Sequence, residues 1–273
     1  MNDAPRRRRL VLALEAGAND PPGLLAAAVN VAMVLRADLD ARLIEDENIL
    51  RAAELPDTWL VPALGASTKM FDTATLRRAF RVRSADVRKQ LAVHADARAL
   101  RWTLKTESGS LADRLAEMVT GMDTVVVCHM RRRGRDAREA LAQALRQISA
   151  SVFLYNRHAQ FGEKVIAMYT GEDSILATAQ ALASEVGLPF EVLLLAHDVE
   201  SLKSRADAVE QWLSEHGQTT VPGGILMDGA GEWIDRLVKS SPATFVCVPD
   251  GSGITDASIG RLADAKSVMI VRV

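Results

Sequence analysis

The strongest constraint on the fold of this chain is a short buried strand that occurs twice. Residues 124–128 read Thr-Val-Val-Val-Cys and run into a charged loop that contains Gly134. Residues 244–248 read Thr-Phe-Val-Cys-Val and run into a loop with Gly251 and Gly253. A short β-branched apolar run that ends in a polar loop indicates a central parallel strand covered on both faces. Because each copy comes late in its half of the chain, the pair predicts a duplicated α/β domain.

Length and composition are consistent with this duplication. At 273 residues the chain is long enough for two domains of about 130 residues, each with its own core. A formal net charge of -2 argues against a dedicated nucleic-acid surface. Two cysteines, both inside predicted strands, do not make a disulfide framework, which favours a cytoplasmic protein. The apolar run at 10–14 is too short for a signal peptide or a membrane span, so the preceding arginines are expected to be solvated.

The spacing of apolar residues predicts the same series of elements in both halves. In the first half we expect strands at 9–14, 39–44, 101–106, 124–128 and 151–155, and helices at 21–37, 73–99, 110–119 and 137–148. In the second half we expect strands at 164–168, 190–196, 219–221, 244–248 and 268–273, and helices at 175–186, 199–216, 230–240 and through Leu262. Ser84 is predicted to cap the last part of the helix that ends near residue 99. The result is an α/β fold of two doubly wound, mostly parallel five-stranded sheets.

These patterns resemble the universal stress protein family, in a divergent tandem form with two such domains on one chain. The resemblance covers nearly all of residues 8–273. It is carried by the repeated opening of strand, polar turn and helix, and by the repeated ending of strand, glycine-containing loop, helix and strand. Residues 43–56 also look like the segment after strand two in divergent bacterial members. The resemblance implies a first domain at 8–157, with an insertion at about 45–83, and a second at 163–273.

Nucleotide-binding members of this family carry an Asp at the end of strand one and, after strand four, Gly-x2-Gly-x9-Gly followed by Ser or Thr. Glycines let backbone N–H groups approach phosphate, and a helix N-terminus adds a favourable dipole. This chain departs from the pattern at strand one in both halves, where Glu15 and Tyr169 stand in place of the Asp. Its first strand-four loop offers only Gly134, set among four arginines. The resemblance therefore implies a degenerate nucleotide site in the first half.

The second strand-four loop has glycines without the required spacing. Gly251, Gly253 and Gly260 are present, and Arg261 takes the place of the Ser or Thr. This site is therefore also expected to be degenerate, and no cofactor is predicted. Gly251, Ser252 and Gly253 either form a small backbone nest for an anion or make an ordinary turn, and the turn is the simpler interpretation.

The arginines around Gly134 offer a second route to phosphate. Arg131, Arg132, Arg133 and Arg135 can bind phosphate directly in place of backbone N–H groups, or they form a solvated basic loop or a protein contact, which is the simpler interpretation. If ATP or AMP binds, the candidate residues are Glu15, Arg131, Arg132, Gly134, Tyr169, Gly251, Ser252 and Gly253.

The sequence contains no recognisable catalytic or metal-binding pattern. The five histidines lack metal-ligand spacing, and there is no Gly-x-Ser-x-Gly elbow or P-loop. Cys128 and Cys247 are interpreted as small buried hydrophobic residues rather than reactive thiols. The acidic run 45–47 is either a solvated helix start or a Mg²⁺ site, and the first is preferred because no paired carboxylate is evident. Residues 57–72 lack a clear period, so they form either a partner-binding element or part of their own core.

We therefore expect a non-enzymatic, cytoplasmic, stress-associated binding protein that contacts an unknown protein partner through residues 45–83 and the arginine loop. An adenine-nucleotide sensor or slow ATPase is the alternative. An enzyme of the related nucleotide α-hydrolase group is disfavoured because its phosphate-loop signature is missing. The resemblance also implies that strands 151–155 and 268–273 pair within one chain and hide both sheet edges. A further homodimer is compatible with the pattern, whereas nucleic acid and a membrane span are not expected.

Overall fold

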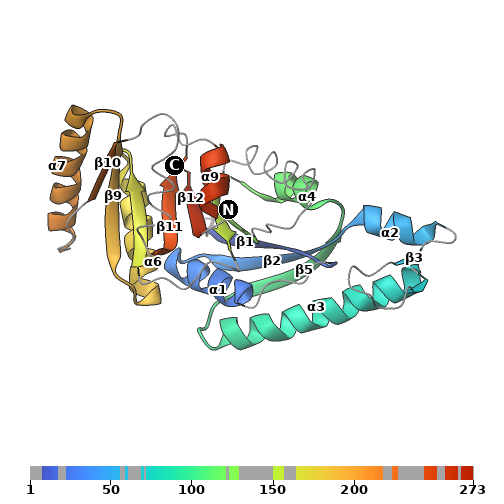
Figure 1. Cartoon of the computed structure of the whole chain (residues 1–273). Helices are drawn as coiled ribbons and strands as arrows, with labels where there is room; N and C mark the ends of the chain where they lie inside the picture. Colours follow the sequence, from blue (N-terminus) through green and yellow to red (C-terminus); the bar gives the residue numbers. More distant parts are fainter. Residues whose placement is uncertain are drawn as a thin grey trace, which may run out of the picture.

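The structure is a computed structural model in which strands and helices alternate along the chain (Figure 1). It describes residues 8–17, 23–55, 59–60, 69–70, 72–120, 123–128, 150–156, 164–217, 223–226, 243–250, 256–263 and 266–272. The first half contains β1 (Arg9–Glu15), α1 (Leu24–Val34), β2 (Asp38–Glu45), α2 (Glu47–Glu54), β3 (Trp59–Leu60), β4 (Lys69–Met70), α3 (Thr73–Asp96), β5 (Trp102–Ser108), α4 (Leu111–Met118), β6 (Thr124–Cys128) and β7 (Ser151–Tyr155). The second half contains β8 (Lys164–Tyr169), α6 (Asp173–Val186), β9 (Phe190–Ala196), α7 (Val199–Glu215), β10 (Gly223–Leu226), β11 (Ala243–Pro249), α9 (Asp256–Ala263) and β12 (Ser267–Val271).

Apart from the short ribbon of β3 and β4, the described strands form one ten-stranded sheet. Its order is β10-β9-β8-β11-β12-β7-β6-β1-β2-β5. The central neighbours β7 and β12 are antiparallel, and the other neighbouring pairs in this sheet are parallel. In each half the first strand lies between the second and the fourth, as in a doubly wound sheet. The predicted fold class is therefore confirmed.

Alternation along the central strands sends apolar side chains to both faces of the sheet. In β1, Leu10 and Leu12 belong to the core shared with α1 and α3, whereas Val11 and Ala13 belong to the core beneath α4. Leu115 of α4 is fully buried on that second face. Burial on both faces explains why β1 and β6 read as nearly continuous apolar runs.

The contact between β7 and β12 joins the two halves of the sheet and involves the two segments for which the sequence implied pairing. Hydrogen bonds from side chains reinforce both ends of this contact. At one end Asn156 donates its backbone N–H to Ser267 Oγ (3.1 Å) and its Nδ2 to the Ala263 carbonyl (2.7 Å). At the other end the Arg272 backbone N–H donates to Ser151 Oγ (3.0 Å). The two halves therefore share one continuous backbone hydrogen-bond network.

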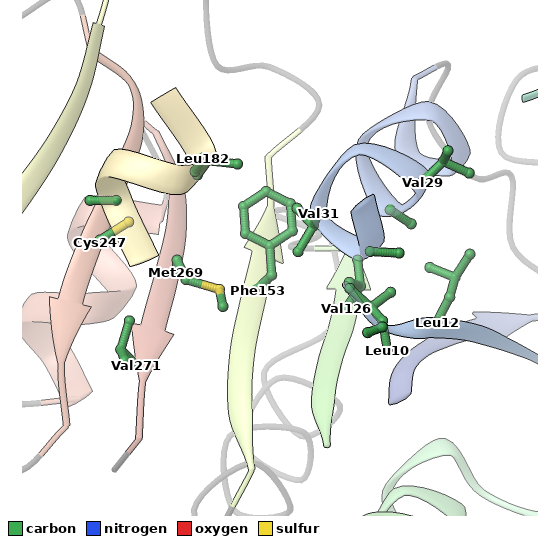
Figure 2. Close-up of a cluster of buried hydrophobic side chains, with 14 of the residues drawn as sticks. Leu10, Leu12, Val29, Val31, Val126, Phe153, Leu182, Cys247, Met269 and Val271 are labelled. Carbon is green, nitrogen blue, oxygen red and sulfur yellow. The ribbon is translucent and has the colours of Figure 1, made fainter. Parts of the chain in front are cut away.

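Phe153 of β7 occupies the centre of the core that both halves share. Its register partner is Met269 of β12, and its ring lies 5.7 Å from that of Phe245, measured between centroids. In the view of Figure 2 the Phe153 ring stands between Val31 of α1 and Leu182 of α6, and both belong to the same buried cluster. Helices from the two halves are therefore packed around one aromatic side chain.

The structure corrects the predicted start of a helix at Ser84. Asp72 caps α3 instead, because its Oδ1 accepts the backbone N–H of Thr75 at 2.8 Å. Ser84 lies inside this single helix, because the apolar spacing continues through it from Phe80 to Val87 on the buried side. The helix also runs across residue 83, where the predicted insertion ends.

Some other predicted elements differ or lie beyond the described ranges. The third strand of the second half is β10, just after Pro222, whereas 219–221, where the strand was predicted, is outside the described residues. The predicted helices at 137–148 and 230–240, and the proposed domain boundary at 157–163, also lie outside the described residues.

Replacing Phe153 by Ala should destabilise the protein by about 4 kcal/mol, because it removes a fully buried ring from the shared core. Urea unfolding followed by circular dichroism measures this change. Val82→Ala is the matched control, since Val82 is 56% exposed and its truncation should cost less than about 0.5 kcal/mol. Equal effects of the two substitutions would show that the shared core does not hold the halves together.

Candidate functional site

The topology places a candidate crevice in each half of the sheet. Open α/β sheets bind ligands outside the carboxyl ends of the strands where the strand order reverses, which is between β1 and β6 and between β8 and β11. Because β7 and β12 are antiparallel while their inner neighbours are parallel to them, the carboxyl ends of the two halves point in opposite directions. The two crevices therefore lie at opposite ends of the strands, and one small ligand cannot contact both.

The structure places one predicted site residue in each crevice. Glu15 ends β1, in register with Ile44 of β2, and is partly exposed. Tyr169 ends β8, in register with Leu194 of β9. These two residues consequently belong to different sites and are not brought together. The remaining predicted residues lie outside the described ranges: Arg131, Arg132, Gly134, Gly251, Ser252 and Gly253.

The first crevice contains an aromatic residue that the sequence analysis missed. Tyr155 ends β7, beside Cys128 of β6. Its hydroxyl oxygen lies 2.9 Å from the position that a Cβ would take on Gly23, the residue before α1. Gly23 has a φ of +90°, a backbone conformation that favours glycine, and a larger residue there would also displace the Tyr155 hydroxyl. The Tyr155 side chain therefore reaches from β7 to the start of α1, across the carboxyl end of the sheet.

At the second crevice, Tyr169 at the end of β8 is buried, with 2% of the residue exposed. Its hydroxyl donates a hydrogen bond to Asp173 Oδ1 at 3.1 Å, at the first residue of α6. Burial, followed by the charge of Asp173, raises the pKa of Tyr169 to about 12. The phenol therefore stays protonated at neutral pH and acts as a donor.

Arg205 of α7 adds a cation beside this tyrosine. Its guanidinium donates to the Leu195 carbonyl near the end of β9, and its charge partly opposes the rise in the pKa of Tyr169. Ser174 follows Asp173 at the start of α6. Its Oγ is buried and has no hydrogen-bond partner among the described residues. The spacing of Tyr169 and Asp173, a strand end followed by a helix start, was a usable signal for this pair. Nothing in the sequence pointed to Arg205, because α7 brings it from a later segment.

The polar and cysteine residues considered as metal or redox sites have structural roles where the structure describes them. Asp46 is the N-cap of α2 and accepts the Asn48 backbone N–H at 2.8 Å, while Glu47 pairs with Arg51 at 3.1 Å. The acidic run is therefore a helix start, as preferred. Burial raises the pKa of Cys247 to about 12, which keeps its thiol protonated and supports its interpretation as a small hydrophobic residue.

The fold resembles solved structures at low sequence identity. A universal stress protein from Archaeoglobus fulgidus DSM 4304 has a TM-score of 0.60 at 9% identity, covering 96% of this chain and 96% of its own. A candidate universal stress protein from Pseudomonas aeruginosa UCBPP-PA14 has a TM-score of 0.58 at 13% identity, covering 98% and 94%. The cytoplasmic domain of a prokaryotic cation chloride cotransporter has a TM-score of 0.54 at 12% identity, covering 97% and 95%.

At these identities the likeness shows the fold alone, which is a universal-stress-protein-like α/β fold. No family model and no curated protein sequence matches this chain. Within the described residues, every helix is too short or too polar to cross a membrane.

Tyr169→Phe should change how stability depends on pH. The folded chain holds the phenolic proton more tightly than the unfolded chain, because the pKa of Tyr169 rises from an ordinary 10.0 to about 12. Its contribution is therefore complete below pH 10 and is lost as pH rises towards about 12, by about 3 kcal/mol in total.

Urea unfolding at about pH 8 and about pH 11 compares the two proteins on either side of the tyrosine titration. The wild type should lose more stability than Tyr169→Phe between these values, whereas at about pH 8 the variant should be only about 1 kcal/mol less stable. Identical losses in the two proteins would mean that burial and Asp173 do not raise the pKa of Tyr169.

Proposed function

We propose that this protein is a non-enzymatic, cytoplasmic binding protein that contacts a protein partner of acidic surface through helix α3. The observation that carries the proposal is a set of exposed cations on α3, called the α3 basic face: Arg77, Arg78, Arg81, Arg88 and Lys89. None of them has an ion-pair or hydrogen-bond partner among the described residues. Asp86 is the only acidic residue between 73 and 95.

The helical repeat gathers these cations on a side of α3 that does not face the core. At about 3.6 residues per turn, Arg77, Arg81 and Arg88 fall on one line along the helix. Val82 and Val93 are 56% and 64% exposed, and each follows a member of the α3 basic face by four residues. This surface therefore combines positive charge with exposed apolar area, which suits a protein partner better than a purely phosphate-bearing one.

The start of α3 lies where a partner can reach it. Figure 1 shows it together with α2 and β3 at the end of the molecule farthest from α7. The Thr73 hydroxyl donates to the Ala53 carbonyl at 3.3 Å, which joins α3 to α2. Because the whole chain carries a formal net charge of -2, this concentration of positive charge is local. Charge complementarity favours an acidic partner and speeds its association.

The two crevices support a binding function without nucleotide. Tyr155 reaches over the end of the first half of the sheet, and Tyr169 is buried at the corresponding strand end of the second. These are the only two tyrosines in the chain. Glu15 is the predicted carboxylate at the end of β1 in the first crevice.

Gently purified protein should contain no stoichiometric adenine nucleotide, because aromatic side chains occupy the strand ends where a base or ribose would bind. Mass spectrometry of the small molecules released by denaturation measures this directly. ATP, ADP and AMP should also leave the melting temperature unchanged up to about 1 mM. A bound nucleotide or a concentration-dependent rise in melting temperature would favour the adenine-nucleotide sensor instead, and turnover of ATP would make the protein an ATPase.

Reversing two charges of the α3 basic face should weaken the binding of an acidic partner. We expect Arg81→Glu/Arg88→Glu to weaken binding of a labelled polyglutamate peptide by about tenfold or more at low salt, as measured by fluorescence anisotropy. The matched control is Arg8→Glu/Lys203→Glu, which changes the net charge equally at exposed sites away from α3.

The same three proteins should then be compared by quantitative affinity capture from an extract of the source cells. A protein retained by the wild type and the control, but lost from the α3 variant, is the expected partner. Equal retention on all three proteins, together with equal polyglutamate binding, would contradict the proposal.

A further inference from the structure

A hollow on the face of β2 and β5 lies apart from both crevices and from the α3 basic face. Its volume is about 660 Å³, within the range of about 300–1,000 Å³ that is usual for small-ligand pockets. Its lining includes Arg9, Asp40, Arg42, Thr103 and Lys105, which come from the first parts of β1, β2 and β5. These side chains share the face of the sheet opposite α1 and α3, because the alternate residues of β2 and β5 enter the core on the α1 side.

Asp40 is neutralised by the residues around it. It accepts two hydrogen bonds from Arg42, from Nε at 2.9 Å and from Nη2 at 2.6 Å. Thr103 Oγ1 donates to it at 2.8 Å, and Arg9 Nη1 donates at 3.4 Å. Asp40 and Arg42 are each 8% exposed. The floor of the hollow is therefore a buried, ordered network in which donors of Arg42, Thr103 and Arg9 engage Asp40. Asp38, the other carboxylate of the lining, pairs with Arg101 at 3.2 Å.

Arg42 retains donors that this network does not use. Besides its two bonds to Asp40, it donates through Nη1 to Glu107 Oε1. A guanidinium has five N–H donors, so two of them remain for another acceptor. The side chain is about nine-tenths buried and belongs to the lining of the hollow.

Lys105 is the direct cross-strand neighbour of Arg42 in the register of β2 and β5. It is exposed and has no ion-pair or hydrogen-bond partner among the described residues. Like charges directly opposite each other on two paired strands are unfavourable. Glu107 pairs with Arg42 and leaves Lys105 uncompensated. An anion placed between the two cations removes this repulsion and uses the spare donors of both.

We propose that this hollow binds a small organic anion, a carboxylate or a phosphate ester, between Lys105 and Arg42. The size of the hollow accommodates more than an inorganic ion, and the anionic group is fixed by the two cations. This site does not depend on the α3 basic face, so either can fail without the other.

Isothermal titration calorimetry of the full chain with inorganic phosphate, succinate and phenyl phosphate tests the site. We expect saturable binding of at least one probe, weakened about tenfold or more by Lys105→Gln, because a charged hydrogen bond is lost. Lys105→Arg should bind like the wild type. Lys89→Gln, which removes an exposed cation from α3 instead, should also leave binding unchanged.

Two further measurements distinguish a ligand site from a structural ion network. Without ligand, Lys105→Gln should melt at the same temperature as the wild type or higher, since it removes repulsion with Arg42. Binding should also shift the backbone amide NMR signals of Thr103 and Lys105. The proposal is overturned if none of the three probes binds up to about 10 mM, if Lys105→Gln binds them as well as the wild type, or if Lys105→Gln lowers the melting temperature.

Discussion

The antiparallel contact between β7 and β12 is the interaction on which the rest of the structure depends. Each half is a five-stranded sheet whose last strand would otherwise present unpaired backbone groups, which favour association with other chains. Pairing the two last strands removes both edges at once. It also brings α1 and α6 over the same aromatic ring, Phe153, so that the two halves share a core as well as a hydrogen-bond ladder. The outer edges of the complete sheet are β5 and β10.

This contact also separates the surfaces on which a ligand or partner can bind. The two crevices lie at opposite ends of the strands. The α3 basic face lies beside α2 at one end of the molecule (Figure 1). The hollow opens on the face of β2 and β5 that is opposite α1 and α3. In the second crevice, Tyr169 bonds with Asp173. Cations without partners are instead found on α3 and at Lys105. The cations on which the two proposals rest thus lie outside the site that the fold would suggest.

The sequence predicted the fold well because buried parallel strands leave a local signal. The apolar runs of β1, β6 and β11 were recognisable without any knowledge of their neighbours. The start of α3 was recognised, but Ser84 was taken as a cap because serine favours caps in general, and only the packing of Phe80 and Val87 shows that the helix continues. The site was much less predictable. Tyr155 meets Gly23 through the tertiary fold, and Lys105 meets Arg42 through a strand register that no local spacing specifies.

The position of β12 in the chain has a consequence for how the protein is made. The ribosome releases β7 long before β12, because the whole second half is synthesised between them. During that interval the first half can form its own sheet, but the apolar edge of β7, with Val152 and Leu154 beside Phe153, has no partner strand. Nascent chains are therefore most vulnerable to aggregation in this period, and chaperone binding at that edge would protect them.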